Sequence, residues 1–302
     1  MSAKPAGCAP SQLGNRRAYS STARTAMPTT PYPSLNLPTR SPERGPNRVS
    51  EKVGSFRQTS GGARRLQPPA ILSTRALSLI RLGRRVLDRI DLHVAPREIV
   101  SLFGPANAGK TAVLECLLGL HPNASGGMSI EGFNPAFDPG IALSYISFVP
   151  SEIRFPTDVT GLTQAKGHCR RLGRNIPENA LRGLLELGGL GREWHGRPIG
   201  HYPPSLRRKL ALSLAILEDR PLLLLDEPTT DLDASEVAAL ALAVRRLRRR
   251  GAAILIATGD LTFTRRVSTR ILHLENGMVL ETTEVTSSRR AHRETSYLAQ
   301  LV

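Results

Sequence analysis

The chain has 302 residues, enough for one domain with an appendage, and 40% of them are hydrophobic. Its net charge of +16 is compatible with nucleic acid or an anionic membrane as partner. Nucleic acid is excluded, because no aromatic residues interleave with the arginines and the sequence has no nucleic-acid-binding motif. The three cysteines have no pairing or metal-ligand spacing and fit a reducing compartment, and no run reaches the ~18 apolar residues that span a bilayer.

Residues 1–70 differ in composition from the rest of the chain. They hold ten of the 23 prolines and eleven Lys or Arg residues, against only Glu43 and Glu51 as acids. Because few of these residues can form a core, we expect a disordered basic extension. Two alternatives stay open: an organellar transit peptide, which is typically Arg- and Ser-rich, and a true start further downstream, for example at Met27.

The next segment predicts short antiparallel strands over 71–103 that lead into a glycine-bearing loop. The residues that follow match G-x-x-x-x-G-K-[ST] and precede a buried helical pattern at 112–120; they are Gly104, Pro105, Ala106, Asn107, Ala108, Gly109, Lys110 and Thr111. Such a loop at a helix N-terminus offers converging backbone N–H groups to a phosphate chain. We predict that Lys110 reaches the β- and γ-phosphates and that the Thr111 hydroxyl binds Mg²⁺.

Residues 145–150 predict a further strand, which ends at Ser151. A small helical region follows over 160–200, where leucines at 181, 184, 185 and 187 form a stripe that Gly188 and Gly189 end.

A second polar motif follows a predicted strand whose sequence indicates burial on both faces. Four leucines at 222–225 show no alternation, which is typical of an inner strand of a parallel sheet, and Asp226 and Glu227 come at its carboxyl end. Ligands of parallel α/β sheets bind at that edge. We predict that Asp226 holds Mg²⁺ and that Glu227 is the general base for an attacking water.

These motifs together resemble those of ATP-binding cassette (ABC) proteins. Gly104–Thr111 is similar to the Walker A motif, 222–227 to the Walker B motif and 230–233 to the D-loop, and the resemblance covers about 71–285. It looks most like the single-cassette subunits of bacterial ABC-2-type exporters. The resemblance implies an α/β P-loop NTPase fold: a parallel core sheet, an antiparallel β subdomain and a small helical subdomain.

Several positions depart from the family pattern. Ser151 stands where the family has a glutamine that reaches Mg²⁺, and Gly259 stands where it has a histidine that contacts the γ-phosphate. The family's signature motif, Leu-Ser-Gly-Gly-Gln, is replaced by 202–206, in which Pro203 and Pro204 have no N–H to donate. Arg81 and Leu82 occupy the place of the aromatic residue that stacks on adenine. These losses predict slow hydrolysis.

Other positions keep the pattern or change it mildly. Asn107 stands where the family normally has glycine, and asparagine is the residue after glycine that best tolerates positive φ. The helical pattern at 210–217 is intact, and we expect Asp260 at most to arrange the loop after the strand at 252–258. Residues 271–284 predict a final hairpin whose turn is 275–277.

The resemblance implies the rest of the functional prediction. We expect a basic extension at 1–70, a nucleotide-binding domain at 71–285 and a basic tail at 286–302. The cofactors are ATP and Mg²⁺, and the partners are a second nucleotide-binding domain, in a homo- or heterodimer, and a transmembrane permease at the cytoplasmic face of a membrane. Besides a transport ATPase, an ATP-binding subunit with little hydrolysis and a decayed gene product remain as alternatives.

Overall fold

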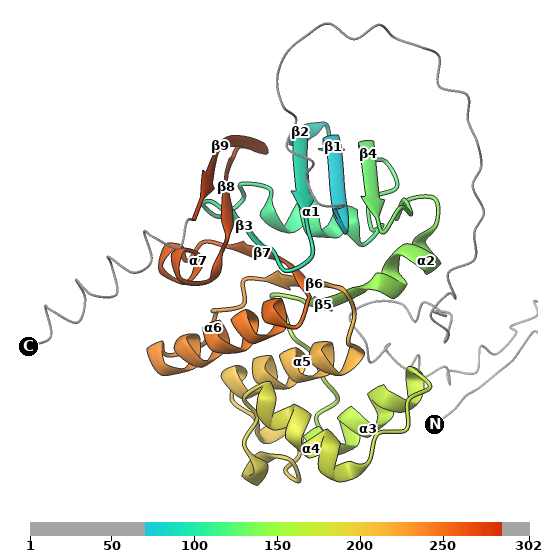
Figure 1. Ribbon diagram of the computed structural model, residues 1–302, viewed down its shortest axis with the longest axis vertical. Coiled ribbons are helices and arrows are strands. Elements are labelled where there is room, and N and C mark those ends of the chain that lie inside the picture. Colours follow the sequence, from blue (N-terminus) through green and yellow to red (C-terminus); the bar gives the residue numbers. More distant parts are fainter. Residues whose placement is uncertain (1–69, 286–302) are drawn as a thin grey trace, which may run out of the picture.

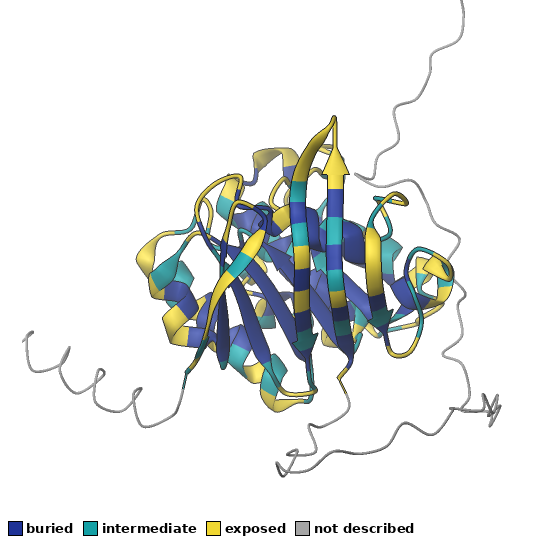
Figure 2. Cartoon of the chain, turned by 90° about the horizontal axis from the view of Figure 1, so that it is seen from above, coloured by how far each residue is buried: buried dark blue, intermediate teal, exposed yellow. Residues whose placement is uncertain are grey.

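The computed structural model describes residues 70–285, and in them two sheets enclose one helix (Figure 1). The smaller sheet is antiparallel in the order β2-β1-β4. Its strands are β1 (Leu72–Arg81), β2 (Arg84–Val94) and β4 (Ser125–Ile130). Figure 2 shows exposed residues along its outer side, because alternate side chains of a strand point to opposite faces.

The larger sheet has six strands in the order β5-β6-β7-β3-β8-β9, of which the first five are parallel. Its strands are β3 (Ile99–Phe103), β5 (Ile146–Val149), β6 (Leu222–Asp226), β7 (Ala253–Thr258), β8 (Arg270–Glu275) and β9 (Met278–Glu284). All residues of β6 are buried, as its unbroken leucine run predicted, and all residues of β7 are buried as well. Because β6, β7 and β3 are neighbours, the segments that follow them meet at one edge of the sheet.

Helices cover both faces of the larger sheet. α1 (Lys110–Leu117) lies between the two sheets and shares a core with both. The opposite face is covered by α5 (Pro204–Glu218), α6 (Ala234–Arg249) and α7 (Leu261–Val267). This arrangement confirms the predicted α/β fold with a parallel core sheet.

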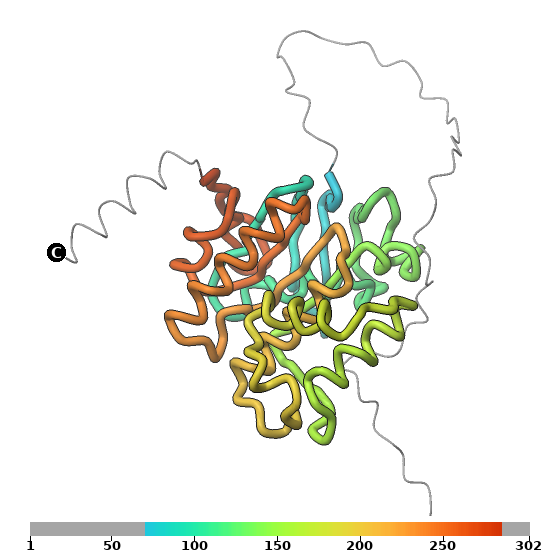
Figure 3. The backbone as a smooth tube through the Cα atoms, turned by 60° about the horizontal axis from the view of Figure 1, so that its bottom comes forward, coloured from blue at the N-terminus to red at the C-terminus, as the bar shows by residue number. Residues whose placement is uncertain are grey.

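A small helical subdomain projects from the core below α5 (Figure 3). It contains α3 (Gly161–Arg171), α4 (Glu178–Leu187) and the 3-10 turns η2 (Arg192–Trp194) and η3 (Ile199–His201). One face of α5 completes its core, with Leu206, Leu210 and Leu214. α4 ends at Gly188 and Gly189, as the sequence predicted.

Two predicted boundaries differ from the structure. The helix expected at 112–120 is α1, which begins at Lys110 and ends at Leu117. The helix expected at 210–217 is α5, which begins six residues earlier, because a proline such as Pro204 is compatible with the first turn of a helix. The remaining short elements are α2 (Pro139–Ala142) and η1 (Leu143–Tyr145).

The last two strands form the predicted hairpin. Asn276 and Gly277 have positive φ angles of 48° and 76°, which suits a tight hairpin turn. The Gly277 N–H donates to the Ala108 carbonyl over 3.1 Å, so this turn packs against the glycine-bearing loop. A Cβ on Gly277 would lie 2.2 Å from the Val86 carbonyl oxygen, which leaves no room for another residue.

The predicted extension at 1–70, except its last residue, and the predicted tail at 286–302 lie outside the described residues. We propose that the cassette begins near residue 71, because 70–285 contains both sheets and three complete clusters of buried side chains. Among the described residues, no helix is long and apolar enough to cross a membrane.

Removing residues 1–69 is expected to leave the fold intact, since residues within 70–285 form both sheets and three clusters of buried side chains. The truncated chain should melt within about 3 °C of the full chain, a shift of less than ~1 kcal/mol. Limited proteolysis of the full chain should leave a stable product that starts near residue 70. Aggregation of the truncated chain, or a large fall in its melting temperature, would place the domain boundary elsewhere.

Candidate nucleotide site

The glycine-bearing loop joins β3 to α1 at the carboxyl edge of the larger sheet. Asn107 and Gly109 have φ angles of 64° and 99°, and asparagine is the residue after glycine that best tolerates this region. A Cβ on Gly104 would lie 2.1 Å from the Leu274 carbonyl oxygen, so this position requires glycine. Pro105, Ala106 and Asn107 are exposed, whereas Gly104 and the residues from Ala108 to Lys110 are buried.

The side-chain ammonium group of Lys110 is held in place by backbone carbonyl oxygens of the loop. Its Nζ donates to the carbonyl oxygens of Gly104 and Pro105, over 2.9 and 2.8 Å. The same Nζ lies 3.4 Å from Glu227 Oε1, across the sheet edge. A buried ammonium group that is fixed in this way is placed to meet a phosphate bound in the loop.

The two predicted Mg²⁺ ligands contact each other. The Thr111 hydroxyl donates to both carboxylate oxygens of Asp226, over 3.1 and 3.2 Å, although 115 residues separate them in sequence. A hydroxyl and a carboxylate are hard oxygen donors that suit Mg²⁺. Within 70–285 no cluster of three or more His, Cys, Asp or Glu side chains could hold a metal. Mg²⁺ usually keeps several waters and binds through one or two carboxylates together with substrate phosphates.

Burial dominates the electrostatics of Asp226, which is only 1% exposed. It raises the pKa of the Asp226 carboxyl, and hydrogen bonds from Thr111 and Ser151 lower that pKa in part. The folded chain therefore disfavours the charged carboxylate. The free-energy cost of burying this charge is fully present above the raised pKa. It shrinks as the pH falls through that pKa toward the ordinary pKa of the unfolded chain.

Asp226→Asn is expected to raise the melting temperature at neutral pH, because it removes the buried charge and keeps an acceptor for Thr111. An increase of about 2–4 °C corresponds to ~1 kcal/mol. The measurement is thermal unfolding in a chelator, between about pH 5 and 8, where the gain should shrink toward acid pH. The exposed Asp158→Asn is the control. An unchanged or lower melting temperature for Asp226→Asn would contradict the assigned cause.

Glu227 is oriented by backbone groups on both sides. Its N–H donates to the Ala257 carbonyl over 2.8 Å, and its φ of 42° is unusual for a residue with a side chain. The Gly259 N–H donates to Glu227 Oε2 over 3.1 Å, while Oε1 faces Lys110. The carboxylate thus points into the space between the loop and β7.

The segment after β7 has Gly259 where the family pattern has a histidine. The Asp260 carboxylate accepts a hydrogen bond from the Phe263 N–H over 2.8 Å and caps α7, so it arranges the loop, as the sequence predicted. A Cβ on Gly259 would meet only the Gly104 carbonyl oxygen, at an ordinary 3.7 Å. Position 259 therefore has room for a side chain that faces the phosphate loop.

Two prolines remove backbone donors from the replaced signature segment. Pro203 is the N-cap residue of α5 and Pro204 its first residue, so neither contributes an N–H. Tyr202 is buried, and its hydroxyl donates to the Trp194 carbonyl inside the helical subdomain. Burial raises the pKa of this phenol. None of these three groups can contribute a hydrogen bond to a phosphate.

The position expected to stack on adenine is open to solvent. Leu82 is 97% exposed at the turn between β1 and β2, and the neighbouring Arg81 is exposed as well. Neither residue offers an aromatic face.

The structure adds one residue that the sequence analysis did not single out, Arg208 on α5. Its side chain is 6% exposed and donates to the carbonyl oxygens of Glu227 and Ser151, over 3.2 and 3.1 Å. It also lies 3.6 Å from the Asp231 carboxylate. The signal for it is an arginine among the apolar positions of α5, but which loops it contacts depends on the tertiary fold.

Comparisons with known proteins agree with this geometry. The sequence profile of the ABC transporter family matches residues 87–230. The zinc import ATP-binding protein ZnuC of Magnetococcus marinus is 31% identical over 205 residues, which cover 68% of this chain and 74% of that protein. A putative ABC transporter ATP-binding protein of Streptomyces coelicolor is also 31% identical, over 70% of this chain, but the chain spans only 38% of its length.

Solved structures show the same fold. A dimeric ATP-binding cassette in a post-hydrolysis state, bound to ADP and Pi, superimposes with a TM-score of 0.65 at 18% identity. The match covers 72% of this chain and 99% of that one. By its sequence relatives and its fold, the chain belongs to the ABC transporter family as an ATP-binding subunit.

Proposed function

We propose that this chain binds MgATP through Gly104–Thr111 and Asp226, with Glu227 beside the γ-phosphate. The observation that carries this proposal is the convergence of Lys110, Thr111, Asp226 and Glu227 at one edge of the sheet. A fixed cation, two oxygen donors for Mg²⁺ and a partly exposed carboxylate are the groups that phosphoryl transfer needs.

The chain acts in a complex rather than alone. We infer a dimer with a second nucleotide-binding domain and a separate membrane permease, which the ABC family membership supports. The dimeric solved cassette supports the first of these partners. In such a complex the chain lies at the cytoplasmic face of a membrane. That this chain serves an exporter stays a prediction, because its relative ZnuC is named for zinc import.

A second candidate is an ATP-binding subunit with little or no hydrolysis. Tyr202, Pro203 and Pro204 favour it, because they offer no donor to the nucleotide of a partner. Gly259 and Ser151 favour it further, because their short or absent side chains replace a histidine and a glutamine. We propose that the nucleotide site of this chain is mainly structural or regulatory.

Binding of a fluorescent ATP analogue to the purified chain, with Mg²⁺ and then with a chelator, tests the proposal. We expect saturable binding that Mg²⁺ strengthens, and Thr111→Ala should reduce the effect of Mg²⁺, since Thr111 Oγ1 contacts Asp226. The absence of binding under both conditions would refute the proposal and would favour the third reading, a decayed gene product.

A further inference from the structure

Arg208 connects the nucleotide site with the helical subdomain. Its guanidinium bonds the carbonyl oxygens of Ser151 and Glu227 and lies beside the Asp231 carboxylate, so one side chain contacts the segments that follow β5 and β6. Arginine can hold several acceptors at once because its donors form a rigid planar fork. Burial lowers the pKa of Arg208, and the carboxylates of Asp231, Asp226 and Glu227 raise it in part.

The helix that carries Arg208 belongs to both parts of the molecule. Leu212 and Ile216 of α5 pack into the core beneath the larger sheet, while Leu206 and Leu210 pack into the helical subdomain. Arg208 itself comes one helical turn after Pro204, the first residue of α5. A shift of the segments that Arg208 holds therefore acts directly on the start of this helix.

The start of α5 is tied in turn to an aromatic pair. Tyr202, two residues before Pro204, bonds the Trp194 carbonyl, and the two rings lie edge to face with their centres 5.5 Å apart. The Arg197 guanidinium lies over the Trp194 ring, 4.6 Å from its centre. Trp194 is the single tryptophan of the chain.

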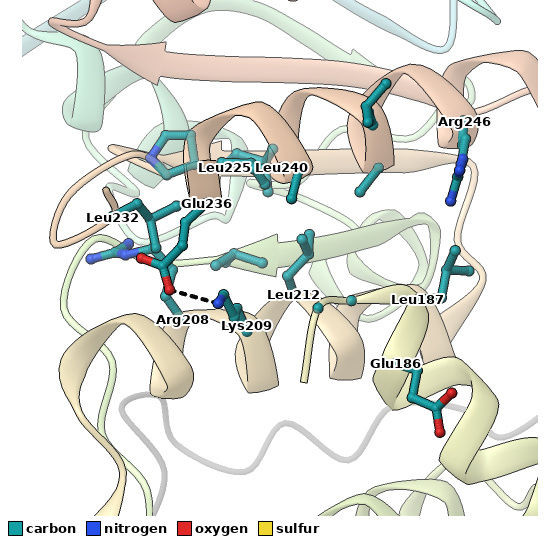
Figure 4. A pocket seen from close by; sticks show the side chains of 17 residues that line it. Glu186, Leu187, Arg208, Lys209, Leu212, Leu225, Leu232, Glu236, Leu240 and Arg246 are labelled. Atoms are coloured by element: carbon teal, nitrogen blue, oxygen red, sulfur yellow. Dashed lines mark hydrogen bonds and ion pairs between the residues drawn. The ribbon is translucent and has the colours of Figure 1, made fainter. Parts of the chain in front are cut away.

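A cavity of about 200 Å³ separates α5 from α6 near Arg208 (Figure 4). Apolar side chains such as Leu212, Leu225 and Leu240 line it, and an ion pair of 2.6 Å between Lys209 and Glu236 closes one side. α5 and α6 therefore enclose an unfilled space beside Arg208, and the Lys209–Glu236 ion pair joins the two helices next to it.

We infer that Arg208 transmits the state of the nucleotide site to the helical subdomain, in place of the glutamine contact that Ser151 cannot make. This inference rests on the proposed binding of MgATP. Arg208 acts as a positioning residue: it touches no nucleotide, but it fixes the backbone of Ser151 and Glu227 relative to α5. When bound MgATP moves the Ser151 segment or the Glu227 segment, Arg208 displaces α5 with it. Tyr202 and Trp194 then move as well.

The test measures binding and transmission separately on the full chain. Isothermal titration calorimetry gives the affinity for MgATP, and the emission of Trp194 reports the response of the helical subdomain. We expect the wild-type chain to show a saturable emission change with the midpoint found by calorimetry. Arg208→Gln should bind with an affinity within about threefold of the wild type and lose most of the emission change.

Three further variants sharpen the test. Arg208→Lys keeps the charge but not the fork of donors, so its response should be reduced. Asp231→Asn changes the half-exposed partner of Arg208 and should also weaken the response, which keeps the test open if the Arg208 variants do not fold. Arg207→Gln, on the same helix, is the matched control, because the hydrogen bonds to Ser151 and Glu227 and the ion pair with Asp231 are made by Arg208 and not by Arg207.

Each other outcome has a distinct meaning. If calorimetry detects no MgATP binding to the wild type, the proposed function fails, and the inference with it. If the wild type binds but Trp194 emission stays constant, the inference alone is refuted. An undiminished response in folded Arg208→Gln, Arg208→Lys or Asp231→Asn, or an equal loss in Arg207→Gln, also refutes it.

Discussion

Lys110→Ala is expected to abolish measurable MgATP binding. The Nζ of Lys110 is fixed by the Gly104 and Pro105 carbonyl oxygens at the mouth of the phosphate loop, where it is a concentrated positive charge for the β- and γ-phosphates. The loss of such charge-assisted hydrogen bonds, together with an uncompensated Glu227 carboxylate, weakens binding by at least about 100-fold. Titration with a fluorescent ATP analogue measures this directly.

The control for this variant is Lys166→Ala. Lys166 lies on α3 and pairs with Glu178 at the surface of the helical subdomain, so its loss should leave the affinity for MgATP unchanged. Melting temperatures of both variants establish that they are folded. Equal affinity of the wild type and Lys110→Ala would contradict the proposed nucleotide site.

The isolated chain is expected to hydrolyse ATP very slowly or not measurably. Glu227 is present and oriented, but catalysis of phosphoryl transfer comes mostly from groups placed around the γ-phosphate. Removing one such group typically costs about 10² to 10³ in rate, and this chain has replaced several. Steady-state phosphate release is the measurement, with Glu227→Gln as the background. Turnover typical of an ABC ATPase that disappears in Glu227→Gln would overturn this expectation.

Gly259→His should recover part of the missing rate. A Cβ at this position meets only the Gly104 carbonyl oxygen at 3.7 Å, so a side chain can begin here, facing the phosphate loop, without displacing the backbone. We expect an increase of at least about tenfold, which Glu227→Gln should abolish in the double variant. Gly259→Ala fills the Cβ position without an imidazole and should have no effect. An equal gain in Gly259→Ala would show that the histidine acts only through the backbone.

The local parts of the site could be predicted because local sequence decides them. A glycine-bearing loop between an apolar strand and a helix has few conformations, so Gly104 to Thr111 indicated the phosphate loop, and Asn107 indeed has positive φ. The unbroken leucines at 222–225 predicted a buried strand for the same reason. The order of these motifs along the chain was enough to indicate the fold.

The helix boundaries were harder because tertiary packing overrides local signals. α5 begins at Pro204 rather than at residue 210, since its first turn packs into the helical subdomain through Leu206. The sequence alone did not reveal that the replaced signature segment is the first turn of this helix. It therefore showed that donors were missing, but not that Tyr202 is buried against Trp194.

The sequence by itself determined the phosphate loop and the two carboxylates, because each depends on short-range periodicity or on residue types at fixed spacing. The resemblance of these motifs to those of ABC proteins implied the fold class. Only the tertiary structure decided which distant groups meet: Thr111 with Asp226, Gly259 with Glu227, and Arg208 with the two loops that follow β5 and β6. The hydrogen bonds Thr111–Asp226, Gly259–Glu227 and Arg208–Ser151 join residues that are 115, 32 and 57 positions apart. They exist because the neighbouring strands β5, β6, β7 and β3 end at one edge of the sheet. No local pattern encodes such an edge; it arises when the strands are buried side by side in one sheet.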